Sequence, residues 1–539
     1  MGLHAEGTDD PKTVRNWRVH WIALVASLSA VAMGYDTAVI GGTMALDSFR
    51  RSYGLDKVSA AQRDTLQGNI VSTFQSGCFF GSLIMFPLAE KIGRKWSTIF
   101  SSVIFLLGGT LMTAASGNIA MIIGGRAIAG FGIGAVSLII PVYISEISPP
   151  SIRGRLIGFF EIASQGGGML GFWINYSSDR SISDNADAQW IMPLGLQLLP
   201  GVLLLVGMMF CPESPRWLAK KDRWEEAEKT LVYLRTLPSH DMYIQNELGQ
   251  IRRQVEERNA NKLSKKEMFK RLIQRGTRNR LAIGVTLMCA QNMTGVNIIT
   301  YYSPRIFETL GITGTDTKLF ATGFYGVAKV VGMIIFSLWV AEKLGRRQGM
   351  IYGSFIGSIP MWYIGGYVLR ARPAEAAAAG NITRDGWGYL AMVCVYLYGL
   401  IYCATLQGLT WLICSEIFPL DVRMLCVAIT TASQWFWSFL ISRTTPYMIT
   451  SLGYGTYMFF GALMIVIGVW SFFCIPETKG VTLETMDAIF AKSVCRSVWD
   501  RLRGREIIVE HDAFSSPRDS LEKEKEVDIV TVERASGRL

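Results

Sequence analysis

Residues 454–475 read YGTYMFFGALMIVIGVWSFFCI, an apolar run without a charged side chain. About 20 such residues in a helix cross a hydrocarbon core about 30 Å thick, so this run qualifies as a transmembrane helix. The composition of the whole chain agrees, because 50% of its 539 residues are hydrophobic, only 18% are charged and the mean hydropathy is +0.28. We therefore predict a membrane protein and exclude the collagen, coiled-coil and disordered classes.

Further apolar runs precede this one, and each ends at a charge cluster or at a turn rich in Gly or Pro. They predict an all-α membrane protein with twelve transmembrane helices in two six-helix halves. The predicted spans are 19–40, 68–89, 97–115, 119–141, 156–176 and 190–211, then 281–303, 318–341, 348–369, 388–415, 424–450 and 454–475.

A charged segment separates the two sets of spans, and within it Trp224, Ala227, Leu231 and Leu234 recur at helical spacing. We interpret this segment as a cytosolic helical linker. The predicted organisation is a cytosolic N-terminus at 1–18, an N-terminal six-helix bundle at 19–211, the linker at 212–280, a C-terminal six-helix bundle at 281–475 and a cytosolic tail at 476–539.

The formal net charge of +10 arises from Lys and Arg clusters in the loops that follow alternate spans. This is the positive-inside pattern of a membrane protein, so we expect the lipid bilayer and no nucleic acid as a partner. Both termini are predicted to be cytosolic, and the plasma membrane is the expected location. Asn381 in the tripeptide Asn381-Ile382-Thr383 would then lie outside, where a glycan could be attached.

The histidines and cysteines carry no pattern of a metal site. The four His residues are scattered, and the nine Cys residues form no CxxC pair. No nucleophile constellation or phosphate-binding loop is readable either. We therefore predict no metal, no cofactor and no enzymatic activity.

An internal repeat relates the two halves. Gly93-Arg94-Lys95 recurs as Gly345-Arg346-Arg347, and Pro212-Glu213-Ser214 recurs as Pro476-Glu477-Thr478. The pair Glu146 and Arg153 recurs with the same spacing as Glu416 and Arg423. Similar offsets for three motif pairs indicate parallel halves, which are typical of a secondary transporter that rocks around a site at the membrane midplane.

Nine motifs resemble those of the sugar porter family of the major facilitator superfamily. The resemblance covers about residues 20–480 and implies the major facilitator fold and the transport of a sugar by alternating access. Fungal quinate and galacturonate carriers are similar in their QN pair in span 7 and their Lys in span 8. The motifs are GYDTAVIGG (34–42), KIGRK (91–95), GRAIAGFGIG (125–134), PVYISEISPPSIRG (141–154), PESPRWL (212–218), QNMTGVNIITYYSP (291–304), EKLGRR (342–347), SEIFPLDVR (415–423) and PETKG (476–480).

Asp36 lies within span 1, where a carboxylate costs several kcal/mol unless it is paired or faces a cavity. A structural helix-packing role is the alternative to a functional one. The resemblance implies proton coupling, because proton-coupled sugar porters carry an Asp at this place and Arg126 of span 4 is its matching partner. Protonation of Asp36 would weaken this pair and let the halves move.

Three further charges fall within spans, namely Glu161, Lys329 and Arg443. With Asp36 and Arg126 they leave one surplus positive charge, which favours an anionic ligand. In the alternative interpretation Arg443 extends to the outer surface and Glu161 pairs with a loop arginine. Lys329 is expected to point into the cavity, since Thr322 and Tyr325 share its helical face.

A hydroxylated ligand requires amides, hydroxyls and aromatic walls. Packing and interhelical hydrogen bonds are the alternative use of such residues. The resemblance places a Gln where Glu161 stands, so the acid departs from a glucose-like site. The candidate substrate-binding residues are Glu161, Gln165, Gln291, Asn292, Asn297, Tyr301, Lys329, Trp411, Gln434 and Trp435.

Six charged residues lie at the cytosolic span ends: Arg94, Glu146, Arg153, Arg346, Glu416 and Arg423. We predict a cytosolic gate in which opposite charges of the two halves pair when the carrier faces outward. Ordinary surface ion pairs, worth about 0–1 kcal/mol each, are the alternative.

The predicted function is import of a monosaccharide or sugar acid by proton symport, with galacturonate or quinate favoured as the ligand. A neutral hexose transporter is the alternative, and a sugar sensor ranks lower because the segment after 480 is short. The functional unit is expected to be a monomer.

Overall fold

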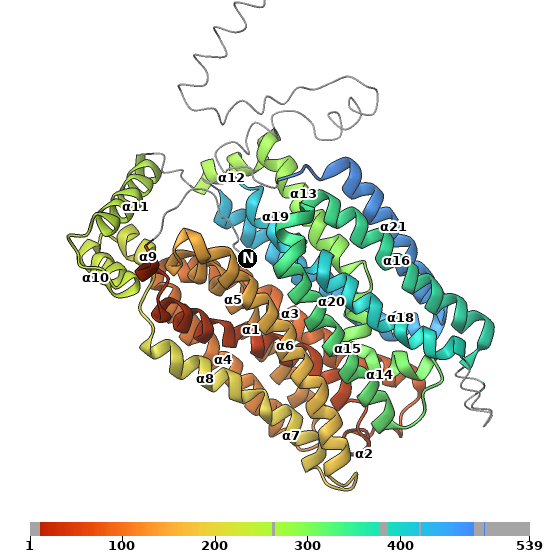
Figure 1. Cartoon of the computed structure of the whole chain (residues 1–539). Helices are drawn as coiled ribbons and strands as arrows, with labels where there is room; N and C mark the ends of the chain where they lie inside the picture. The colour runs from red at the N-terminus through yellow and green to blue at the C-terminus, as the bar shows by residue number, and fades with distance from the viewer. Residues whose placement is uncertain are drawn as a thin grey trace, which may run out of the picture. The chain divides into compact units, whose positions relative to one another are not determined.

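The computed structural model describes residues 11–260, 265–373, 376, 386–419, 422–478 and 490. The predicted glycan acceptor Asn381 and the tail beyond residue 490 lie outside this part of the chain. Every regular element in the described ranges is a helix (Figure 1). The expected all-α class is therefore confirmed.

Ten helical segments are long and apolar enough to cross a membrane within the described chain. In the first half these are α1 (Trp17–Thr43), α3 (Ala60–Ile92), α4 (Arg94–Thr113), α5 (Ile119–Ile147) and the pair α7 (Ala188–Leu196) and α8 (Leu198–Phe210). In the second half they are α13 (Arg275–Asn292) with α14 (Val296–Thr309), α15 (Thr315–Ile335) with the π-helix η2 (Phe336–Leu344), α18 (Gly386–Tyr402) with the π-helix η3 (Cys403–Gln407) and α19 (Gly408–Glu416), α20 (Arg423–Leu452) and α21 (Gly455–Cys474).

Two more helices complete the predicted twelve spans. They are α6 (Pro150–Ser181), of 32 residues, and α16 (Arg346–Ala371), of 26 residues. The composition of α6 is less apolar because it carries buried polar side chains such as Gln165 and Asn175. Those side chains face the protein rather than lipid, so a hydropathy average underestimates this span.

The internal repeat has a physical basis at the first turns of α4 and α16. The Glu213 carboxylate accepts hydrogen bonds from the backbone N–H groups of Arg94 and Lys95, and Glu477 accepts equivalent bonds from Arg346 and Arg347. A carboxylate at a helix N-terminus satisfies free N–H groups and complements the helix dipole. Burial raises the pKa of Glu213, whereas these backbone hydrogen bonds oppose the rise.

Glycine is required at both caps. Gly93 and Gly345 have φ of 98° and 86°, values that favour glycine. A Cβ atom would also lie 2.2 Å from Glu213 at the first position and 2.7 Å from Glu477 at the second. The repeated Gly-Arg and Pro-Glu motifs are thus the two sides of one capping contact, present once in each half.

The linker segment contains α9 (Pro215–Lys220), α10 (Trp224–Arg235), α11 (Met242–Ala260) and α12 (Lys265–Ile273). Ala227 and Leu231 are fully buried in a small apolar core, as the helical spacing predicted. The Arg235 guanidinium donates to both carboxylate oxygens of Glu247 at 2.9 and 2.6 Å and to the Ile147 carbonyl at 2.9 Å. The last contact fastens this small domain to the end of α5.

We name the two ends of the membrane bundle by their neighbours. The linker end is the one at which α9, α10 and α11 lie, and the far end is the one near α2 (Asp47–Ser52) (Figure 1). At the far end, Arg305 of α14 donates to Asp64 Oδ1 of α3 at 2.7 Å and to Thr450 Oγ1 of α20 at 2.7 Å. The Thr450 hydroxyl donates to Asp64 Oδ2 at 2.5 Å.

This contact joins the two halves across the far end. The Asp64 side chain is only 5% exposed, so water screens its charge weakly. A second cross-half hydrogen bond lies beside it, where the hydroxyls of Thr65 and Tyr447 are 2.9 Å apart. The far end is therefore closed in this conformation.

Asp64→Asn should loosen the far end, because a hydrogen bond to a charged group contributes about 1.5–3 kcal/mol. The measurement is the distance distribution between spin labels at the far ends of α3 and α14, which we expect to broaden toward longer distances. Exchanging the charges through Asp64→Arg with Arg305→Asp should restore the closed distribution. Asp47→Asn is the control, since Asp47 pairs within α2 with Arg50 at 3.9 Å. An equal change in the control contradicts the assignment.

Candidate functional site

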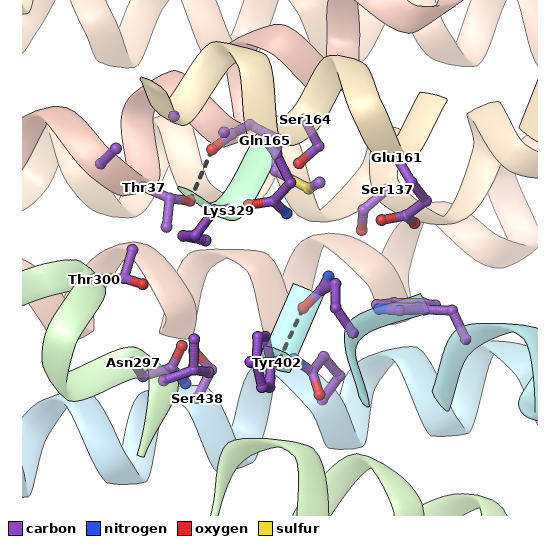
Figure 2. A pocket seen from close by; sticks show the side chains of 18 of the residues that line it. Thr37, Ser137, Glu161, Ser164, Gln165, Asn297, Thr300, Lys329, Tyr402 and Ser438 are labelled. Atoms are coloured by element: carbon purple, nitrogen blue, oxygen red, sulfur yellow. Dashed lines mark hydrogen bonds between the residues drawn. The ribbon is translucent and has the colours of Figure 1, made fainter. Parts of the chain in front are cut away.

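A cavity of about 130 Å³ lies between the two halves. A single water needs about 10–15 Å³, so this space suits a small organic molecule. Helices α1, α5 and α6 line it from the first half, and α13, α14, α15, α18, α19, α20 and the π-helix η3 line it from the second. Figure 2 shows Thr37, Glu161 and Gln165 facing Asn297, Tyr402 and Ser438 across it.

Nine of the ten candidate substrate-binding residues lie on the cavity wall. They are Glu161, Gln165, Asn292, Asn297, Tyr301, Lys329, Trp411, Gln434 and Trp435. The tenth, Gln291, lies behind the wall and donates from Nε2 to Gln407 Oε1 at 3.1 Å. Gln291 thus contacts the cavity through another side chain, because its side chain points about 100° away from that of Asn292 around the axis of α13.

The amides of the second half form a connected wall. Asn297 donates to Asn292 Oδ1 at 2.6 Å, and Asn292 donates to Gln434 Oε1 at 2.8 Å. A weaker bond of 3.3 Å joins Asn297 to the Ser438 hydroxyl. These bonds fix amides from α13, α14 and α20 in place before any ligand arrives, which lowers the entropy cost of binding.

Sequence reasoning missed Tyr402 and Gln407. Both line the cavity, and the Tyr402 hydroxyl donates to Gln407 Oε1 at 2.9 Å. The π-helix η3 occupies residues 403–407, and its wider turn changes which side chains share a face. The available signal was the position of Gln407 four residues before Trp411, one helical turn away.

Small hydroxyl residues were also missed, among them Thr37, Ser137, Ser164 and Thr300. Serine and threonine in membrane helices commonly bond their own backbone, as the Ser137 hydroxyl does with the Gly134 carbonyl at 2.8 Å. Their frequency in apolar spans therefore gives no sign of a cavity. Ser137 has a second contact, since it accepts a hydrogen bond from Trp435 Nε1 of the other half at 3.2 Å.

Lys329 of α15 points into the cavity, as the sequence predicted (Figure 2). Its Nζ lies 5.7 Å from the centre of the Tyr325 ring. Among the described residues no carboxylate forms an ion pair with it. Lys329 is thus a cavity cation whose observed neighbour is an aromatic ring.

The other two unexpected charges have different environments. Arg443 lies toward the far end, where it donates to the Thr65 carbonyl at 3.4 Å and the Tyr447 hydroxyl at 3.2 Å. This agrees with the alternative in which Arg443 stays outside the site. Glu161 lines the cavity within hydrogen-bonding reach of Gln407, and its expected alternative partner, a loop arginine, is not found among the described ion pairs.

Asp36 and Arg126 form the predicted ion pair, and both side chains are fully buried. Arg126 also donates to the Ile70 carbonyl at 3.2 Å, and its guanidinium lies 4.5 Å from the centre of the Phe74 ring. Asp36 Oδ2 has no hydrogen-bond partner in the described part of the chain. The pair lies outside the cavity wall, on the side of α1 that faces α5, whereas the neighbouring Thr37 faces the cavity.

The charges at the linker end pair within each half. Arg94 contacts Glu146 at 3.0 Å, and Arg346 contacts Glu416 at 2.9 Å. Arg423 donates to the Ser415 carbonyl at 2.7 Å, and the buried Nε of Arg153 has no hydrogen-bond partner in the described ranges. The expected pairs between the halves are therefore absent among these residues in a conformation whose far end is closed.

Known proteins that are similar in sequence belong to one transporter family. The sequence model of the family described as "Sugar (and other) transporter" matches residues 22–490. A protein of Aspergillus flavus named "Probable quinate permease" is 42% identical over 90% of both chains, and the "Quinate permease" of Emericella nidulans is 41% identical over 92% of both.

Solved structures give the same fold. A structure of the proton:xylose symporter XylE bound to 6-bromo-6-deoxy-D-glucose has a TM-score of 0.72 and 26% identity, covering 88% of this chain and 99% of that one. An inward open XylE from E. coli has a TM-score of 0.69 and 25% identity, covering 87% and 99%.

Asn297→Ala should raise the half-saturation concentration for the ligand two- to tenfold, because each lost hydrogen bond costs roughly 0.5–1.5 kcal/mol. Uptake kinetics, normalised to the amount of protein in the membrane, provide the measurement. Asn69→Ala on α3 outside the cavity wall is the control and should leave the affinity unchanged. Unchanged affinity in Asn297→Ala would remove the amide wall from the binding site.

Proposed function

The chain belongs to the sugar (and other) transporter family, and we propose that it imports a polyhydroxylated carboxylic acid, such as quinate or a hexuronate, by proton symport. The observation that carries this proposal is Lys329, a cation on the cavity wall without a carboxylate partner among the described residues.

Charge balance supports an anionic ligand. A lysine within a membrane span is costly unless it faces water or an opposite charge. Asp36 is already paired with Arg126, and Arg443 lies away from the cavity, so Lys329 is available for a ligand. The permeases whose sequences are similar to this chain are named for quinate, a carboxylic acid with several hydroxyl groups, which fits the same chemistry.

The rest of the wall suits the hydroxyl groups of such a ligand. Asn292, Asn297 and Gln434 offer donors and acceptors, and Trp411 offers a flat apolar surface for a six-membered ring. Glu161 is acceptor-only when ionised, so it would accept bonds from ligand hydroxyls. The cavity thus offers partners for both the carboxylate and the hydroxyl groups of such an acid.

A neutral hexose is the second candidate, and Glu161 is the observation that favours it. An acid on the wall repels an anionic ligand unless the two carboxylates are held apart. The solved neighbour XylE is named as a xylose symporter, which agrees with a neutral ligand. The two candidates differ in whether Lys329 contributes to affinity.

Proton coupling in our proposal rests on Asp36. Its carboxylate is buried against Arg126, and its second oxygen is free to accept a proton in the described structure. Protonation removes one charge of a buried pair and so changes the free energy of the contact between α1 and α5. A change of that kind can bias two conformations of the halves.

We further propose that the linker end faces the cytosol of a cell whose plasma membrane holds the protein. The Lys and Arg clusters at this end support that orientation. Arg153 and Arg423 would then pair across the halves with Glu416 and Glu146 when the linker end closes. The domain limits, the glycan at Asn381 and a monomeric unit stay predictions.

Asp36→Asn should abolish accumulation of labelled quinate against a gradient, because the proton acceptor is lost while the cavity is intact. Exchange of labelled for unlabelled quinate should continue, and parent uptake should fall as external pH rises toward neutrality. Accumulation ratios with and without a protonophore measure both effects. Asp47→Asn is the control carboxylate outside the pair, and full accumulation by Asp36→Asn rules out the proton role.

Lys329→Met should lower the affinity for quinate at least tenfold, because removal of one partner from a buried charge pair typically costs 2–5 kcal/mol. Inhibition of uptake by quinate, galacturonate and glucose gives the comparison, and the parent should prefer the acids. Lys318→Met on the same helix is the control, since Lys318 contacts Glu308 at 3.7 Å. Strong glucose uptake that neither acid inhibits would return the ligand to a neutral hexose.

A further inference from the structure

Phe74 of α3 lies between the proposed proton site and the cavity. On one side, the Arg126 guanidinium carbon is 4.5 Å from the centre of its ring. On the other side, the Trp435 ring of α20 approaches edge-on, with centroids 6.4 Å apart and an interplanar angle of 84°. Trp435 itself lines the cavity, so one aromatic side chain touches both sites.

The position of Phe74 is fixed by close packing. Its side chain is fully buried. Its carbonyl oxygen lies against Gly130 of α5, where a Cβ atom would come within 2.1 Å. Gly130 is one helical turn beyond Arg126, so the helix that carries the guanidinium also holds the backbone of Phe74. Neither group can move far without the other.

The Trp435 ring comes from the second half and is also held at its polar edge. Its Nε1 donates to the Ser137 hydroxyl of α5 at 3.2 Å. A ligand in the cavity would touch this ring, since Trp435 and Ser137 both belong to the wall. Rocking of the halves must change the contact between Trp435 and Phe74, because these residues lie on opposite sides of the interface.

A second contact between the halves lies one residue further along α3. Gln75 accepts a hydrogen bond from the Tyr301 hydroxyl of α14 at 2.8 Å, with the amide oriented to face that donor. Tyr301 also lines the cavity. Positions 74 and 75 therefore both join the region of Arg126 to the ligand-facing side of the second half.

We propose that Phe74 is a positioning residue that couples ligand binding at Trp435 to the proton state of Asp36 through Arg126. This proposal rests on the proposed function. Cation–π attraction is strongest when the cation is desolvated. When protonation of Asp36 removes the negative partner, this attraction becomes a larger share of the interactions that hold Arg126. The ring then holds the guanidinium. Through its contact with Trp435, the position of the ring makes the second half sensitive to whether Asp36 is protonated.

Thermodynamic linkage makes the effect reciprocal. If protonation of Asp36 changes how firmly Phe74 holds Arg126, a ligand that fixes Trp435 changes the proton affinity of Asp36 by the same factor. Tyr35 of α1, Cys78 of α3 and Tyr301 of α14 are the other titratable side chains of the described residues that interact electrostatically with Asp36 or Arg126. Arg126 is the charged partner from α5.

The test measures accumulation under a proton gradient and exchange without a gradient in membrane vesicles, so that coupling and transport are followed separately. The probe is labelled quinate, or labelled glucose if glucose is the substrate carried. Phe74→Leu keeps an apolar side chain but removes the ring. We expect its accumulation ratio under a proton gradient to fall at least fivefold, its half-saturation concentration to lose its pH dependence, and exchange without a gradient to stay within twofold. Phe74→Tyr keeps the ring face and should retain both accumulation and pH dependence.

Phe105→Leu is the matched control, because Phe105 is a buried phenylalanine of α4 away from the cavity wall. Normal accumulation by Phe74→Leu overturns the proposal. The proposal is also overturned if Phe74→Leu and Phe74→Tyr both lose exchange together with accumulation.

A double-substitution cycle identifies the route. In the Asp36→Asn background the half-saturation concentration should already be independent of pH, because the group through which Phe74 acts is gone, and Phe74→Leu should leave it so. A pH dependence that persists in Asp36→Asn and disappears when Phe74→Leu is added overturns the route through Arg126. Failure of the proposed function looks different: Asp36→Asn itself would accumulate substrate, whereas failure of this inference leaves Asp36→Asn uncoupled and Phe74→Leu coupled.

Discussion

The buried ion pair of Asp36 and Arg126 constrains the whole first half. Both side chains are fully buried. An isolated charge is far less stable in the protein interior than in water. Three helices must therefore stay in register, with α1 supplying the acid, α5 the guanidinium, and α3 the Ile70 carbonyl and the Phe74 ring. The pair is charged, buried and incompletely hydrogen-bonded, so a single proton can alter how these helices pack.

The cavity between the halves has a different kind of lining from this ion pair. Its second-half wall consists of amides already bonded to each other, whereas Lys329 contributes a charge without a carboxylate partner in the described structure. A wall of fixed amides favours hydroxyl groups, and a cavity cation favours a carboxylate. The proposed proton site and the proposed ligand site are thus chemically separate, and they meet at the aromatic contact of Phe74.

Hydropathy and motif spacing could predict the twelve spans and nine of the residues on the cavity wall. Charged or amide side chains in an apolar helix are conspicuous, which is why Lys329 and Asn297 were found. Tyr402 and Gln407 were missed because the π-helix changes the helical phase. Gln291 lies behind the wall because its side chain points about 100° away from that of Asn292 around the helix axis. The contact of Arg443 with the Thr65 carbonyl of α3 required the structure, because Thr65 lies 378 residues earlier in the chain.

The central claim is that one carrier moves an acid with several hydroxyls together with protons. Purified protein in liposomes, with a pH-sensitive dye outside, tests it most directly. Addition of quinate should make the weakly buffered external medium more alkaline at a rate that follows quinate entry, and liposomes carrying the Asp36→Asn protein should show entry by exchange without that pH change. Quinate entry into parent liposomes at an unchanged external pH would contradict the account.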